Sequence, residues 1–461
     1  MYNDHYEEQS VGCLGGILSR LGVTNSPVYV RASSSDEKLP AYEECMSQAS
    51  PLNASHAMHR MDVKADSEVE AIVKKAINDV SSELRAISLD LHENMETGMK
   101  EFHAHEVLTN YLESKGFKVT RGAYGMETAF QAEYTRGEGR RVGICSEYDG
   151  LPGLGQGCGH NLIAISGVAT VIGVKALLDS GKASGKVILF GTPAEELSIG
   201  KIVMVHKRAF QDNVDVCMML HPGPYDANYA AMIAVHDVKL EFYGKPTHAS
   251  ATPWEGVNAL DAMVQVWNNI SMMRQQLLPT DRVHGIVTNG GQAPNIIPDR
   301  TSAFFFVRTT RFSEIDRLMK KLENCFTAAA LSTGCEVNWT WREIGVTKDV
   351  FQNSVLADKY GAYMEKEGIK FPSREEQQKG AGGSTDMGNV SYEIPTIHPI
   401  FGIHTTASNH TIGFTAAAKT LDAHNDTIMA CRGLALTAAD VLLDESFYQA
   451  VKRDFDENVK N

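Results

Sequence analysis

The chain has 461 residues, which is more than one average domain needs and enough for a large core with a second module. With 43% hydrophobic and 22% charged residues, its composition is that of a globular protein. The formal net charge of -14 argues against nucleic acid and against an anionic membrane as partners, because both need a basic surface. The same charge would mildly attract a cationic substrate.

The cysteines and the N-terminal region indicate a compartment. Eight cysteines are scattered without paired spacing, and several lie in apolar runs, as Cys217 does in VDVCMML, which is typical of reduced thiols. Residues 1–62 are rich in Ser and Glu and are expected to form a disordered tail, with no signal-type apolar core. No apolar run approaches the roughly 20 residues that span a bilayer. A cytoplasmic protein without membrane contact is therefore expected.

From residue 67 onward, helices and strands alternate. Apolar residues recur every three or four positions from Ser67 to about Glu96, which predicts an amphipathic helix, and a second helix is expected at about 100–114. The strands expected next are 117–124, 128–135, 141–146, 186–192 and 214–220, with helices at about 161–178 and 199–210. This order predicts an α/β fold with a mixed, largely parallel sheet covered by helices on both faces.

A second module is expected at residues 232–348. Its predicted order of strand, helix, strand, strand, helix and strand is the split arrangement of a ferredoxin-like α+β module. It interrupts the larger domain, which the pattern assigns to residues 63–231 and 349–461. In the second part we expect a helix near 353–367, a strand near 396–403 and a final helix at about 421–443.

Candidate ligand side chains come directly after predicted strands. In open α/β sheets, ligand sites gather at the carboxyl ends of strands, so these side chains are expected to converge. Singly, each has an ordinary structural alternative: a lone His or Cys is commonly part of the core, and paired Glu residues are commonly a solvated turn. The glycine-rich run 153–159 could suggest a phosphate cradle, but it lacks GxGxxG spacing. The converging candidates are Glu147, Asp149, Cys158, His160, Glu195, Glu196, His221 and His410.

Five segments together resemble one known family. They are SEYDGLPGLGQGCGHN, GTPAEE, MMLHPG, GKPTHASATPWEGVNALDA and GGSTDMGN with the later SNHT. In this order, over about residues 65–445, they resemble peptidase family M-twenty, whose members are dinuclear metallo-amidohydrolases. The likeness is greatest to the cysteine-ligand branch, which includes aminobenzoyl-glutamate hydrolase and, most similar of all, the dipeptidase group called peptidase M-twenty domain-containing protein 2.

The resemblance implies a ligand set. Cys158 would bridge two metal ions as a thiolate, and Asp149 would orient a ligand from outside the coordination sphere. Whether Glu147 touches metal is left open, and His404 and His398 are weaker competitors for the last ligand position. The implied ligands besides Cys158 are His160, Glu196, His221 and His410.

The residue types indicate the metal, and the resemblance implies the general base. A thiolate favours zinc, while imidazole and carboxylate also admit manganese or cobalt. Coordination lowers the pKa of water from about 15.7 to about 7. By resemblance, Glu195 is the general base that moves the proton of that water to the leaving amine.

Further residues are assigned by the same resemblance. His248 would enter the active site, usually that of a partner subunit, and stabilise the oxyanion; a loop-capping histidine is the alternative. Asn295 and Arg308 match positions near the carboxylate end of the substrate. Ser384 and Thr385 belong to a glycine-rich turn that could bind a carboxylate with backbone amides.

The expected activity is therefore metal-dependent hydrolysis of a dipeptide or an N-acyl-amino-acid amide bond, by a homodimer acting on a small molecule. A dipeptidase is the first choice, and an N-acyl- or aryl-amino-acid deacylase is the alternative within enzymes. The alternative from another class is an inactive binding protein on the same scaffold.

Overall fold

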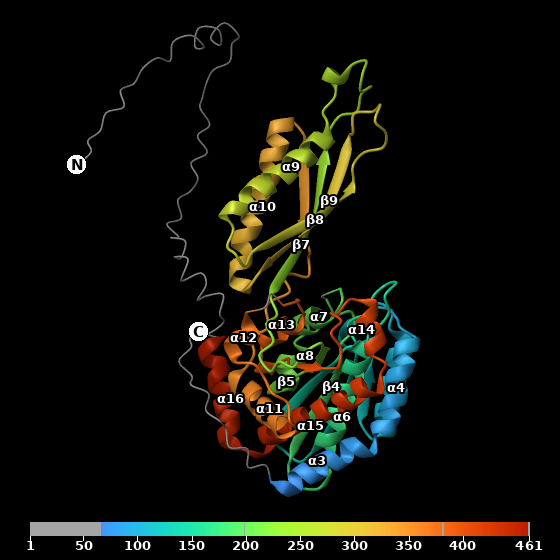
Figure 1. Cartoon of the computed structure of the whole chain (residues 1–461), viewed down its shortest axis with the longest axis vertical. Coiled ribbons are helices and arrows are strands. Elements are labelled where there is room, and N and C mark those ends of the chain that lie inside the picture. Colours follow the sequence, from blue (N-terminus) through green and yellow to red (C-terminus); the bar gives the residue numbers. More distant parts are fainter. Residues whose placement is uncertain (1–65, 198, 380–381, 460–461) are drawn as a thin grey trace, which may run out of the picture. The chain divides into compact units, whose positions relative to one another are not determined.

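The computed structural model describes residues 66–197, 199–379 and 382–459. The tail predicted at residues 1–62 lies outside the described residues. Two sheets dominate, one of six strands and one of four. The predicted fold class is confirmed: a mixed α/β sheet is accompanied by a separate antiparallel sheet (Figure 1).

The six-stranded sheet has the order β1-β2-β4-β3-β5-β11. The pairs β1/β2 and β2/β4 are antiparallel, whereas β4/β3, β3/β5 and β5/β11 are parallel. A separate two-stranded parallel sheet joins β6 to β12. The strands are β1 (Lys118–Arg121), β2 (Phe130–Arg136), β3 (Arg141–Ser146), β4 (Gly185–Gly191), β5 (Val216–Met218), β6 (His221–Gly223), β11 (Thr396–Ile397) and β12 (Ile400–Gly402).

Helices cover both faces of this sheet because successive side chains of a strand point to opposite faces. In β4, Val187 and Leu189 join the large core formed with α3, α4, α6, α11 and α15, while Ile188 and Phe190 join the core formed with α7, α8 and α13. In Figure 1, α6 and α15 run side by side. The helices are α3 (Ser67–Asp79), α4 (Ser81–Glu93), α5 (Phe102–Ser114), α6 (His160–Asp179), α7 (Gly200–His206), α8 (Ala209–Asn213), α11 (Ser354–Lys366), α12 (Arg374–Gln378), α13 (Met387–Ser391), α14 (Ile412–Ala417), α15 (Leu421–Leu443) and α16 (Glu445–Asn458).

Helix α6 corrects one expectation from the sequence. Among the described residues it is the one helix long and apolar enough to cross a membrane. Its most apolar window is 89% buried inside the folded chain, where it contacts α3, α4, α15 and the sheet. Its apolar surface is therefore accounted for by the core of this sheet.

The antiparallel sheet has the order β10-β7-β9-β8 and carries α9 and α10 against it. The order along the chain, β7-α9-β8-β9-α10-β10, is the predicted ferredoxin-like one. Its hydrophobic core is its own, built around Phe242, Phe305 and Phe326. The elements are β7 (Ala234–Tyr243), α9 (Ala259–Met273), β8 (Arg282–Asn289), β9 (Arg300–Thr309), α10 (Ile315–Thr333) and β10 (Glu336–Trp341).

Candidate metal centre

The donor side chains come from loops at one edge of the six-stranded sheet. Glu147 directly follows β3, Glu195 lies just beyond β4, and His221 begins β6 shortly after β5. Because β3, β4 and β5 are parallel neighbours, their carboxyl ends meet at that edge. The stretch between β3 and α6 adds Cys158 and His160, and the loop after β12 adds His410.

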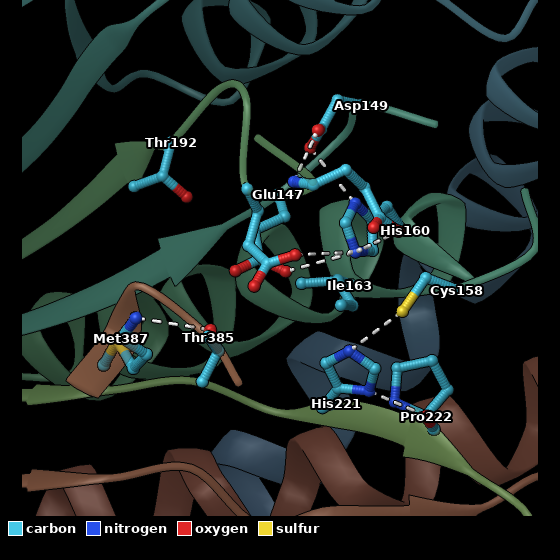
Figure 2. Close-up of polar contacts among 12 residues, drawn as sticks. Glu147, Asp149, Cys158, His160, Ile163, Thr192, His221, Pro222, Thr385 and Met387 are labelled. Atoms are coloured by element: carbon cyan, nitrogen blue, oxygen red, sulfur yellow. Dashed lines mark hydrogen bonds and ion pairs between the residues drawn. The ribbon is translucent and has the colours of Figure 1, made fainter. Parts of the chain in front are cut away.

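Two groups of three donors share the thiol of Cys158. The first consists of Cys158, His160 and His221, with all donor atoms within 4.8 Å of one another. The second consists of Cys158, Glu196 and His410, within the same limit. Figure 2 shows the Cys158 and His221 side chains pointing toward each other, and Cys158 Sγ lies 3.4 Å from His221 Nε2. A sulfur common to two triads has the placement that a ligand bridging two ions requires.

The backbone around Cys158 is tightly constrained. Gly159 has φ +76°, and a Cβ there would lie 2.8 Å from Pro222 Cγ. This glycine precedes α6 and lets Cys158 and His160 approach the same centre from the two sides of the turn. The backbone of His410 is also fixed: it adopts φ 64°, and its N–H donates to Gly157 O at 2.7 Å.

Asp149 is fully buried and contacts two of the predicted ligands. Its Oδ1 lies 3.1 Å from His160 Nδ1, and its Oδ2 accepts the Glu196 N–H at 3.0 Å. A carboxylate on the far nitrogen of a histidine fixes the ring and its tautomer. Asp149 therefore has the geometry of an orienting residue rather than of a ligand.

The hydrogen bonds of the buried His160 and the half-buried His221 leave one nitrogen of each ring without a proton and facing the centre. His160 Nδ1 donates to Asp149, and His221 Nδ1 donates to Pro222 O at 2.8 Å. With a proton on Nδ1 alone, as a bound cation would require, each ring presents the lone pair of Nε2 inward. His160 Nε2 has no hydrogen-bond partner within the described residues and lies 3.8 Å from Glu195 Oε2 and 4.0 Å from Glu196 Oε1.

This arrangement fits a bound cation. A lone pair set against carboxylates is repulsive unless a positive charge lies between them. Glu196 Oε1 is likewise buried without a hydrogen-bond partner among the described residues, and it lies 3.4 Å from His410 Nε2. The donor set of one thiolate, imidazoles and carboxylates is that of a site for divalent transition metals.

The pKa shifts of the site residues also indicate a site that binds cations. Burial alone would raise the pKa of the Cys158 thiol, but His221 and the hydrogen bonds from the surrounding histidines lower that pKa well below its usual value. The negative groups beside it, first Cys158 and then Glu196, raise the pKa of His410 to about 10. A site that stabilises a thiolate and extra positive charge on histidine is one that attracts cations.

Glu195 lies beside the donors with its carboxyl group buried. Burial, together with the charges of Glu147 and Glu196, raises the pKa of Glu195 well above its usual value. A carboxylate with a raised pKa is a stronger base, which suits proton transfer. The backbone turns at Ala194, at φ 58°, so the two adjacent glutamates need not alternate as in a strand.

A buried ion pair beside the centre, between Lys201 and Asp386, was not predicted from the sequence. Lys201, the second residue of α7, has a fully buried ammonium group bonded to Glu147 and to Asp386. Glu147 also forms a third candidate metal-binding group with His160 and Glu195. Asp386 lies in the predicted glycine-rich turn, but its carboxylate accepts from Lys201. The sequence signal was weak, since one Lys at the start of a helix is usually exposed.

The two competing histidines lie differently. His404 is exposed and pairs with Asp426, its Nδ1 lying 2.7 Å from Asp426 Oδ2. His398 is fully buried, and its ring centroid lies 5.5 Å from that of His221. The candidate metal-binding groups found among the described residues include neither His404 nor His398.

His248 lies in the antiparallel-sheet segment, outside the donor cluster. It is exposed in an irregular loop, where its Nδ1 accepts the N–H groups of Ser250 and Ala251 at 3.2 Å each. With Nδ1 accepting, the neutral ring carries its proton on Nε2 and offers a donor to the outside. Asn295 is exposed nearby, and its carbonyl accepts the Ala249 N–H at 3.0 Å.

Of the other predicted substrate residues, Arg308 has a donor available to a ligand, whereas Thr385 has a structural role. Arg308 in β9 donates from Nη1 to Ser384 Oγ at 3.3 Å, and its buried Nε has no hydrogen-bond partner within the described residues. Thr385 is buried, and its Oγ1 accepts the Met387 N–H at 3.2 Å, as Figure 2 shows. Thr385 thus stabilises the turn in which it lies, while the Nε–H of Arg308 has no acceptor among the described residues.

Comparison with known proteins gives consistent matches. The peptidase dimerisation domain matches residues 235–333. The Xaa-Arg dipeptidase of Mus musculus is 41% identical over 402 residues, covering 84% of this chain and 93% of the relative. The Homo sapiens enzyme of the same name is 40% identical over 401 residues, with 83% and 90% covered. A p-aminobenzoyl-glutamate hydrolase chain of Escherichia coli is 25% identical over 460 residues, with 84% and 95% covered.

Solved structures share the fold. A Bacillus subtilis protein described as a dinuclear metal-binding peptidase matches with a TM-score of 0.61 at 20% identity, covering 79% of this chain and 99% of the other. The fold and the donor set together define a metal-dependent hydrolase of amide bonds. With relatives near 40% identity over most of both sequences, the chain belongs to the M-twenty peptidase family, within its dipeptidase group.

Proposed function

We propose that this metallopeptidase hydrolyses dipeptides whose C-terminal residue is basic, using two zinc ions held by the two triads that share Cys158. The shared thiol is the observation that carries the proposal, because it gives each of two ions three protein donors. The substrate class follows the Xaa-Arg dipeptidases of Mus musculus and Homo sapiens. The net charge of -14 agrees with a cationic substrate.

The metal follows from the donors. Cys158 as a thiolate favours zinc, and the imidazole and carboxylate donors also admit manganese or cobalt. When bound, a pair of divalent ions polarises the scissile carbonyl and lowers the pKa of water to near neutrality. Asp149 keeps His160 and Glu196 oriented for this task through its two oxygens.

Proton transfer is assigned to Glu195. Its buried carboxylate, with a raised pKa, takes a proton from water and passes it to the amine that leaves. Glu196, the next residue, serves as a ligand. The two roles require the two carboxylates to diverge, and the left-handed turn at Ala194 supplies that change of direction.

Oxyanion stabilisation is assigned to His248, supplied across a homodimer. Its Nε2–H is free to donate because Nδ1 is occupied by backbone amides. One such donor typically contributes about 3 kcal/mol to lowering the barrier. Arg308, Asn295 and Ser384 are assigned to the substrate carboxylate, with Thr385 supporting the turn. The free thiols of the described cysteines support a cytoplasmic, reducing location.

A substrate panel tests this proposal. Purified chain with zinc, and separately with manganese, is assayed on dipeptides ending in Arg, Lys, Leu and Glu, and on N-acyl and aryl amides of the same amino acids. Higher kcat/KM for dipeptides ending in Arg or Lys is expected. Faster hydrolysis of acyl or aryl amides would favour the deacylase alternative instead.

The variant Glu195→Gln separates an enzyme from an inactive binding protein. It should lose turnover while both metal ions stay bound, because Glu195 is not in either triad with Cys158. Turnover at the wild-type rate would remove Glu195 from the mechanism. A wild-type chain that binds substrate dipeptides without cleaving them would indicate a binding protein.

A further inference from the structure

Beside the donor cluster lies a buried charge network centred on Lys201. The side chain of Lys201 is fully buried, and its Nζ donates to Glu147 Oε1 and, at 2.6 Å, to Asp386 Oδ1. The backbone N–H of Lys201 donates to Asp386 Oδ2 at 2.7 Å. Glu147 and Asp386 are also fully buried. Three side chains, from the end of β3, from α7 and from the turn before α13, thus form one closed ion cluster.

The cluster reaches the metal centre through the second oxygen of Glu147. That Oε2 is buried, has no hydrogen-bond partner within the described residues, and lies 3.5 Å from His160 Nε2. Figure 2 shows the Glu147 and His160 side chains directed at each other. Since His160 Nε2 is the bare nitrogen identified above, Glu147 and His160 face the same space.

Burying an ammonium group is costly, and a close-packed apolar side chain is commonly as stable in its place. Here the ammonium lies where negative charge accumulates, since Glu195 and Glu147 both face His160. A fixed positive charge behind Glu147 offsets the repulsion among these carboxylates. It also holds one oxygen of Glu147, so that only the other can face the centre.

We propose that Lys201 is a positioning residue for the metal centre: it clamps Glu147 and Asp386 so that Glu147 directs one carboxylate oxygen at the ion held by His160. This inference rests on the proposed function, because it assumes that an ion binds there. It assigns a role to Glu147, Lys201 and Asp386, none of which belongs to a triad that shares Cys158. In this role Lys201 touches neither substrate nor ion and acts through Glu147.

The test measures zinc affinity rather than activity. The full-length chain is stripped of metal, and Zn²⁺ is titrated in competition with a chromogenic chelator, with elemental analysis giving the number of ions bound. The variants are Glu147→Gln, which keeps an acceptor for Lys201, Lys201→Met, which keeps the apolar stem, and the double variant, which removes both charges together. Lys74→Met is the matched control, since Lys74 forms ion pairs with Glu70 and Glu367, and neither belongs to a candidate metal-binding group.

Weakening of one of the two zinc sites by about tenfold or more is expected in each of the three cluster variants, as for other groups that orient metal ligands. The other site and the Lys74→Met control should change less than twofold. A folded double variant with wild-type affinity at both sites would overturn the inference. So would a loss of folding in all three variants, because the cluster would then serve stability alone.

The wild-type titration separates this inference from the proposed function. A wild-type chain that binds two Zn²⁺ while Glu147→Gln binds them equally well overturns the role of Lys201 and leaves the proposed function intact. A wild-type chain that binds fewer than two ions overturns the proposed function, and the role of Lys201 falls with it.

Discussion

Cys158 is the single residue on which both donor triads depend. A hydroxyl cannot replace its thiolate, because a serine stays protonated where the thiol ionises. We predict that Cys158→Ser binds at most one zinc ion, by elemental analysis, and loses on the order of 100-fold or more in kcat/KM. Two zinc ions retained in the folded variant would contradict a bridging role.

The control for this change is Cys217→Ser. Cys217 is fully buried, with Sγ 3.5 Å from Cys145 Sγ, and it belongs to neither triad. Its replacement should leave both zinc ions bound, even where the melting temperature falls.

A second residue-scale prediction concerns acid stability. His424 in α15 is buried, with its ring 2.9 Å from Ser81 Oγ, and burial together with Arg85 lowers its pKa to about 4. The unfolded chain, with a His pKa near 6.5, takes up the proton first, so stability from this residue is complete above pH 6.5 and is lost as the pH falls toward 4. The loss is on the order of 2 kcal/mol.

Thermal unfolding across this pH range measures the effect. His424→Gln removes the titrating group and keeps a polar side chain, so its melting temperature should fall less between pH 7 and pH 4.5 than that of the wild type. If the melting temperatures of the two proteins fall in parallel with pH, groups other than His424 account for the loss of stability in acid.

At the scale of elements, the close approach of α6 to β3 sets the position of the metal centre. Gly167 in α6 permits this contact, since a Cβ there would lie 2.1 Å from Ser146 Oγ and 2.8 Å from Leu189 Cδ1. We predict that Gly167→Ala destabilises the protein by about 1–3 kcal/mol, because a close-packed contact must open. Chemical denaturation with the midpoint and slope both fitted is the measurement.

Gly290→Ala is the control for this substitution, because a Cβ at Gly290 meets nothing within 4 Å. It should change stability by less than about 0.5 kcal/mol. Equal effects at the two positions would mean that the contact of α6 with β3 is not the cause.

Elements with a strong apolar pattern were predictable from sequence, and their interruptions were not. The helix expected at 161–178 corresponds to α6, and the strand expected at 186–192 corresponds to β4. The single helix expected from Ser67 to about Glu96 divides at Val80 into α3 and α4. A change of backbone direction at one residue leaves the apolar period almost intact, so the pattern cannot reveal it.

Two other breaks have local causes. Arg208 adopts φ 59°, which ends the helix expected at 199–210 and separates α7 from α8. The strand expected at 214–220 is shorter, as β5, and β6 begins just after it at His221. The strand expected at 396–403 divides into β11 and β12, and Pro399, which lacks an N–H, lies at the break. Both segments leave the six-stranded sheet together and pair again as β6 and β12.

For the site, the sequence could indicate which donor side chains follow which strands. It could not indicate which buried charged side chains form ion pairs next to those donors. Cys158, His160 and His221 were predicted from residue type and strand position, and the structure brings them together. The ion pair of Lys201 with Asp386 was missed because neither residue directly follows a predicted strand, and Asp386 was considered only as part of a glycine-rich turn. The packing of α7 against α13 makes them neighbours.

At the scale of the whole molecule, the antiparallel-sheet segment carries apolar side chains that a single chain leaves exposed. Trp267 and Val264 on α9 and Ile286 and Val287 on β8 are between 41% and 63% exposed. Together with the match to a peptidase dimerisation domain, they support a second copy of the chain as the partner. The role proposed for His248 requires such a second copy.

Subunit mixing tests whether His248 acts across the dimer. Glu195→Gln and His248→Ala should each be nearly inactive as homodimers, since one lacks the base and the other lacks the oxyanion donor. In a mixed dimer, one site combines Glu195 of one protomer with His248 of the other and is complete. Random exchange makes half of the dimers mixed, so we predict recovery to about a quarter of wild-type activity.

Co-expression with two affinity tags isolates the mixed dimer directly, and its kcat should then be about half that of the wild type with an unchanged KM, since one of its two sites is complete. The zinc content must remain at two ions per chain, which excludes loss of metal as the cause of inactivity. A mixed dimer as inactive as its parents would place His248 in the same protomer as the Glu195 it serves, or outside the reaction.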